Sequence, residues 1–140
     1  MRFPAAVLLL AIACTTPDAA PVDVEAISLL GDTLRRPQLT DTVLAHHRVE
    51  LDSARARYAA DTASADALIW LGRRTAYLGR YREAIDIFSD GIARFPDDPR
   101  FLRHRGHRYI TVRELDRAIT DLANAAHMIA GTPEIGRAHV

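Results

Sequence analysis

The sequence predicts an all-α fold in which antiparallel helical hairpins stack against one another. Apolar and small residues recur at helical spacing on both sides of Gly79, which indicates two helices joined by a short turn. The same pattern returns about 34 residues further along the chain. The corresponding residues are Leu68 and Leu102, Gly72 and Gly106, Ala84 and Ala118, Ile85 and Ile119, and Phe88 and Leu122.

Small residues inside the predicted helices support this arrangement. Glycine within a helix costs about 1 kcal/mol relative to alanine, so Gly72 and Gly106 indicate places where a second helix comes close. Ala84 and Ala118 are the partners expected across each hairpin. Residues 96–99, Pro-Asp-Asp-Pro, end the first unit, because proline cannot continue a helix and suits the first turn of the next one.

The repeated unit resembles the tetratricopeptide repeat (TPR), whose pattern is W-x2-L-G-x2-Y…A-x3-F…P. The first unit, residues 65–98, reads Leu68-x2-Leu71-Gly72-x2-Thr75…Ala84-x3-Phe88…Pro96. The second unit, residues 99–132, reads Leu102-x2-Arg105-Gly106-x2-Tyr109…Ala118-x3-Leu122. The resemblance implies a TPR-type α-solenoid.

The chain begins with a short charged segment followed by an apolar run. Met1 and Arg2 precede an apolar run that ends in small residues, which is the layout of a secretory signal over residues 1–14. Leu10-Ala11-Ile12-Ala13-Cys14 resembles a lipobox, in which Cys14 becomes the lipidated first residue. With Thr15 after the cysteine, the resemblance implies an outer-membrane anchor and a body facing the periplasm. The alternative is an ordinary signal peptide that leaves a free thiol.

Two segments lead into the repeats. Residues 15–39 are expected to be a linker followed by an ordered strap over a hydrophobic face, because Gly31 and Pro37 interrupt a leucine-rich stretch. Residues 40–64 predict an N-terminal packing helix, capped by Thr40 or Asp41 and ending near Ala60. Its apolar face lies against the first repeat. The residues of that face are Val43, Leu44, His47, Leu51, Ala54 and Tyr58.

Four further helices are predicted at about residues 65–78, 81–94, 99–112 and 115–129. The terminal residues 134–140, Glu-Ile-Gly-Arg-Ala-His-Val, resemble the in-frame translation of a sequencing adapter. We therefore expect an artefactual tail on a truncated fragment, since a repeat array normally ends in a capping helix. A genuine short polar tail is the alternative.

The sequence favours a binding protein over an enzyme. The formal net charge is zero over 140 residues, which argues against nucleic acid as a partner. No Ser-His-Asp elbow, phosphate loop or HExxH helix is present, and no cofactor is expected. His104 and His107 can share one helical face, but nearby arginines would repel a metal cation and no further ligands complete a metal site.

The resemblance also implies a concave groove lined by the first helix of each hairpin. At the family's groove positions stand Asp66, Ile69, Arg73, Ala76 and Tyr77 in the first unit, and Arg100, Arg103, His107, Ile110 and Thr111 in the second. From these we expect a ligand-binding groove formed by Arg73, Tyr77, Arg100, Arg103 and His107. Guanidinium groups suit carboxylates, so an acidic peptide or protein partner is expected. The alternative is solubilising charge paired with Asp66, Asp97 or Asp98.

These observations predict a non-catalytic interaction scaffold that is attached to the bacterial envelope only through its lipid. The alternative is the N-terminal recognition domain of a larger envelope enzyme. The gene beyond the break would decide between them, because further repeats favour the scaffold and a catalytic motif favours the enzyme.

Overall fold

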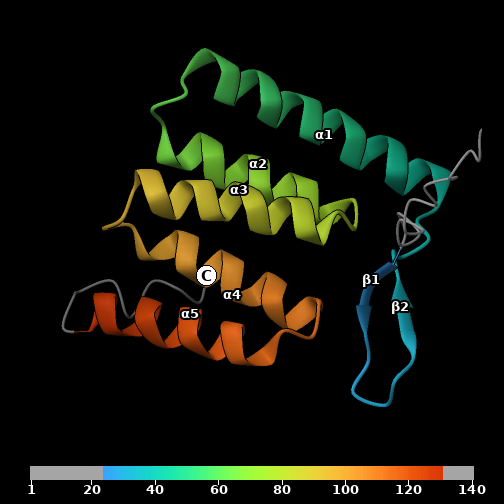
Figure 1. Cartoon of the computed structure of the whole chain (residues 1–140). Coiled ribbons are helices and arrows are strands. Elements are labelled where there is room, and N and C mark those ends of the chain that lie inside the picture. Colours follow the sequence, from blue (N-terminus) through green and yellow to red (C-terminus); the bar gives the residue numbers. More distant parts are fainter. Residues whose placement is uncertain (1–23, 131–140) are drawn as a thin grey trace, which may run out of the picture.

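The structure, a computed structural model, describes residues 24–130 and contains five helices within that range (Figure 1). Their bounds are α1 Asp41–Ala60, α2 Ala65–Tyr77, α3 Tyr81–Arg94, α4 Pro99–Thr111 and α5 Leu115–Ile129. Successive helices pack against each other along the chain, so that two antiparallel hairpins, α2–α3 and α4–α5, stack beside α1. The predicted positions of the five helices are confirmed.

Local chemistry explains where these helices begin. The side-chain oxygens of Thr40 and Ser64 accept hydrogen bonds from the backbone N–H of Val43 (3.4 Å) and Ala67 (3.2 Å). Asp98 caps α4 in the same way, with Pro99 in the first turn. The turn into α3 contains Gly79 at φ 72°, a left-handed conformation that glycine adopts without strain.

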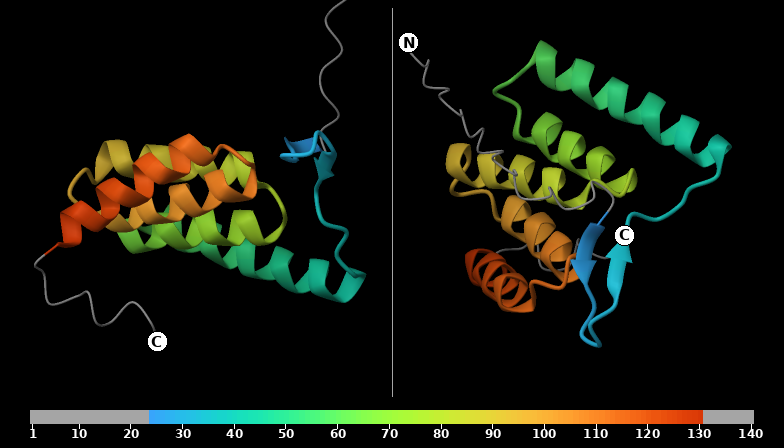
Figure 2. Two further views of the ribbon diagram at one scale, coloured as in Figure 1. Left: turned by 90° about the horizontal axis from the view of Figure 1, so that it is seen from below. Right: turned by 45° about the vertical axis from the view of Figure 1, so that its right-hand side comes forward.

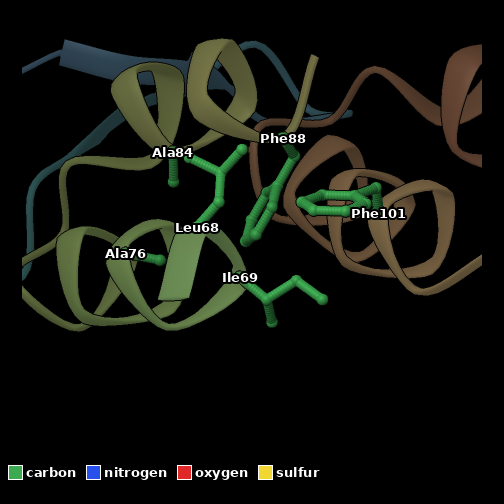
Figure 3. Packing of buried hydrophobic residues seen from close by; sticks show 6 residues of the cluster. All are labelled: Leu68, Ile69, Ala76, Ala84, Phe88 and Phe101. Carbon is green, nitrogen blue, oxygen red and sulfur yellow. The ribbon is translucent and has the colours of Figure 1, made fainter. Parts of the chain in front are cut away.

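One buried cluster holds α2, α3 and α4 together (Figure 3). It comprises Leu68, Ile69, Ala76, Ala84, Phe88 and Phe101. Gly72 belongs to this contact, because a Cβ atom built on it would lie 2.5 Å from the Phe88 ring. In the same way, a Cβ atom built on Gly106 would lie 2.8 Å from the side chain of Leu122. The predicted close approach of the helices is confirmed, but the glycines face Phe88 and Leu122 instead of the alanines.

α1 packs against α2 as expected, although its apolar face is narrower than predicted. Leu51 and Ala54 are buried, whereas Leu44, His47 and Tyr58 are only half-buried. Val43 is 41% exposed, so its assignment to the packed face was wrong. It lies in the first turn of the helix, where α1 runs past the end of α2 (Figure 1).

Residues 24–35 form an antiparallel β-hairpin, which the sequence did not predict. Strands β1 Val24–Ile27 and β2 Thr33–Arg35 pair with Ala26 opposite Leu34, and Gly31 lies between the strands at φ 90°. The hairpin lies beside the same end of the stack as the turns within the two helical hairpins (Figure 2). Ala26 is buried there against Ile85, Tyr109, Val112 and Ala118. Leu29 and Leu30 do not cover a hydrophobic face, being 77% and 92% exposed.

Candidate functional site

A groove of about 480 Å³ lies between α2 and α4, the first helices of the two hairpins. Phe88 of α3 contributes to its lining, and the remaining lining residues come from the two facing helices. These are Arg73, Ala76 and Tyr77 of α2, and Arg103, His104, His107 and Arg108 of α4. None of these lining residues is acidic, so the groove carries three guanidinium charges without an opposing carboxylate.

The three groove arginines differ from most arginines within residues 24–130. Nine others in the described range, such as Arg82 with Glu114 at 3.0 Å and Arg105 with Asp121 at 2.7 Å, form ion pairs with carboxylates. Between residues 24 and 130, no carboxylate pairs with Arg73, Arg103 or Arg108. The groove therefore presents cations that remain available to an external anion.

Two of these arginines contact aromatic side chains. Arg73 donates a hydrogen bond from Nη2 to the Tyr77 hydroxyl at 3.2 Å, and its guanidinium lies 4.2 Å from the centre of the Trp70 ring. Arg108 lies over the Tyr81 ring at 5.8 Å. Such contacts orient a guanidinium without neutralising its charge.

Two histidines share this cationic environment. The His104 ring stacks on Phe88, with ring centres 5.4 Å apart, and burial followed by the charges of Arg103 and Arg73 lowers the pKa of His104 to about 4. Burial, with Arg108 and Arg103, also lowers the pKa of His107. Each cause disfavours the charged imidazolium, so the arginines alone supply the positive charge at neutral pH.

The structure brings together Arg73, Tyr77, Arg103 and His107, four of the five groove residues selected from the sequence. Arg100 is the exception, and its predicted convergence with the others is wrong. Its guanidinium donates to Asp66 at 2.6 Å and to Asp98 at 2.7 Å, which places it at the start of α4. These carboxylates hold Arg100 outside the groove.

Sequence reasoning missed Arg108, His104 and Phe88, which also line the groove. The family's groove positions do not include Arg108 or His104, although the alternation of arginine and histidine over residues 103–108 was a visible signal. Trp70 faces α1, because it lines a small pocket with Glu50, Ala54 and Arg57.

Two features are absent from the described part of the chain. Residues 24–130 contain no group of three or more His, Cys, Asp or Glu side chains that could hold a metal ion. No helix in that range is long and apolar enough to cross a membrane. Cys14 and residues 134–140, for which predictions were made above, lie outside the described residues.

Comparison with known proteins supports the fold. No family model and no curated protein matches this sequence. Among solved structures, the type III secretion translocator chaperone SycD of Yersinia enterocolitica is 25% identical, with a TM-score of 0.63 over 66% of this chain and 69% of that one. SycD in complex with a peptide of the translocator YopD is 25% identical, with a TM-score of 0.61 over 66% and 71%. A type III secretion complex from Aeromonas hydrophila is 26% identical, with a TM-score of 0.60 over 71% and 74%. The chain is thus an all-α protein whose helical hairpins stack as a TPR-type α-solenoid.

Proposed function

We propose that this protein is a non-catalytic interaction scaffold whose groove binds an acidic segment of a partner protein. The observation that carries the proposal is the convergence of Arg73, Arg103 and Arg108 in one groove without carboxylate partners in the described range. Arginine forks suit carboxylates, and an extended peptide could engage several of them at once. SycD, which resembles this chain, has been solved with a translocator peptide, and this supports peptide binding by the fold.

Binding of a fluorescein-labelled hexaglutamate peptide, followed by fluorescence anisotropy at low salt, tests this function. Replacing Arg73 or Arg103 by alanine should raise the Kd about tenfold, because a hydrogen bond to a charged group contributes about 1.5–3 kcal/mol. Arg48→Ala is the matched control, since Arg48 is exposed and forms no carboxylate ion pair among residues 24–130. Equal Kd values for all three variants and the parent would refute the proposal that the peptide binds in this groove.

We also propose that Cys14 carries a lipid that anchors the protein in the bacterial envelope, facing the periplasm. The charged start, the apolar run and the lipobox-like Leu10–Cys14 stretch support this proposal. Cys14→Ser should release the protein from the membrane fraction, because the lipid would be the attachment. If the serine variant still sediments with membranes and migrates as a lipidated species, the proposal of a lipid anchor at Cys14 is wrong.

A further inference from the structure

The groove contains a titratable group that the proposed function does not use. His107 is exposed, lies on α4 between Arg103 and Arg108 in the sequence, and lines the groove beside them. We propose that an acidic ligand enters this groove together with a proton, and that His107 takes up that proton and becomes part of the anion-binding site. This inference rests on the proposed function and makes His107 a specificity-determining residue.

The charged groups around the two histidines are all of one sign. His104 is faced from α2 by Arg73 and from α3 by the uncharged ring of Phe88, and Tyr77 of α2 lines the same groove. On α4 their charged neighbours are Arg103 and Arg108. In the free protein, burial and then the charges of Arg108 and Arg103 lower the pKa of His107 and favour its neutral imidazole. A bound carboxylate would offset the arginine charges and give the imidazolium an acceptor, so it would favour protonation.

The geometry favours His107 over His104 as the proton acceptor. His104 is stacked on Phe88 and its pKa is lowered to about 4, so a large change would be needed to charge it in mild acid. His107 is more exposed and can contact both ligand and water. His104 therefore acts as a neutral aromatic part of the groove wall.

The direction of the pH dependence follows from linkage. If the ligand raises the pKa of His107, then protonation of His107 raises the affinity for the ligand by the same factor. Affinity should rise as pH falls from above the pKa of His107 in the complex to below its pKa in the free protein. Outside that interval this group adds no further pH dependence.

The test uses the full chain and the labelled hexaglutamate peptide at constant ionic strength, between about pH 8 and pH 5.5. Glutamate side chains have pKa values near 4.3, so the peptide stays largely ionised over this range. We expect the Kd to fall about tenfold, because the protonated imidazole adds a hydrogen bond to a charged group of the ligand. Calorimetry in two buffers of different ionisation enthalpy should show uptake of up to about one proton per peptide bound.

Three variants separate the roles of the residues. His107→Asn and His107→Gln should lose the tightening in acid and the proton uptake, so that the Kd of each variant near pH 5.5 equals its own Kd near pH 8. His104→Phe should keep both, because it preserves the ring against Phe88. Circular dichroism confirms that each variant is folded, and either His107 variant suffices for the comparison.

The possible outcomes are distinct. Binding with the same Kd at all pH values and no proton uptake would overturn this inference and leave the proposed function intact. If His104→Phe lost the pH dependence while the His107 variants kept it, the assignment of the proton uptake to His107 would be wrong. Absence of peptide binding at every pH would overturn both the function and the inference.

Discussion

At the scale of single residues, the protonation state of the groove residue His104 affects the stability of the fold. Its pKa in the folded state, about 4, lies below the ordinary value of 6.5, so between these values the unfolded chain binds more protons than the folded one. The stabilisation by neutral His104 is fully present above about pH 6.5 and is lost as pH falls toward 4.

The titration of His104 predicts that the parent and His104→Phe lose different amounts of stability in acid. Because His104 is partly open to solvent, we expect the contribution to be about 1–2 kcal/mol instead of the full value for a buried group. Urea unfolding at about pH 7 and pH 4.5 should show a smaller acid-induced loss of stability for His104→Phe than for the parent. Comparing the two proteins cancels the titration of carboxylates such as Asp98 and Glu114. An equal loss in both would show that His104 titrates normally.

Gly72 gives a second residue-scale prediction. A Cβ atom at this position would lie 2.5 Å from Phe88, so Gly72→Leu forces a large side chain into the α2–α3 contact. Overpacking of this kind costs about 1–3 kcal/mol or more. Ala93→Leu, on the exposed side of α3, should change stability by less than about 0.5 kcal/mol. A thermal melt of Gly72→Leu that matches the parent would contradict the packing described here.

The groove shows what residue patterns can predict. The groove positions implied by the resemblance to the tetratricopeptide repeat include Arg73, Tyr77, Arg103 and His107, which line one groove in the structure. The sequence analysis did not pair individual arginines with carboxylates, because the partner of a long side chain depends on how the helices pack in three dimensions. Arg100 and Asp66 occupy equivalent positions in successive units, and the stacking of these units brings them within 2.6 Å. That pair could have been inferred from the repeat itself.

At the scale of elements, the β-hairpin was not predictable from periodicity because its strands contain only four and three residues. Its position depends on contacts with distant parts of the chain. Arg82 donates to the backbone carbonyl of Glu25 at 3.1 Å, and Arg36 pairs with the Glu25 carboxylate at 3.0 Å. Ala26 then contacts the cluster formed where α3 and α5 begin and α4 ends. Tertiary packing therefore specifies these strands.

Two substitutions in the β-hairpin test whether its buried side packs against the helices. Ala26→Arg places a charged side chain at a site that is 5% exposed, and we expect a loss of about 2 kcal/mol or more in the free energy of unfolding. Leu30→Arg introduces the same side chain at the exposed turn and should change stability by less than about 0.5 kcal/mol. Chemical denaturation of both variants measures the difference. Equal effects would show that the hairpin does not cover the cluster.

At the scale of the whole molecule, a formal charge of zero conceals an uneven distribution of charge. Most arginines in ion pairs lie at the surface, where each pair contributes about 0–1 kcal/mol to stability. The groove concentrates three cations that lack such partners in the described range. Salt should therefore affect stability and ligand binding very differently.

Raising the ionic strength from about 0.05 M to 0.5 M shortens the distance over which exposed charges interact to a few ångströms. We expect hexaglutamate binding to weaken about tenfold or more over this range, whereas the thermal midpoint should move by only a few degrees. Anisotropy titrations and melting curves at matched salt concentrations measure the two effects. If binding proved independent of salt, contacts other than the groove arginines would hold the peptide, because a site built on Arg73, Arg103 and Arg108 attracts its ligand mainly through charge.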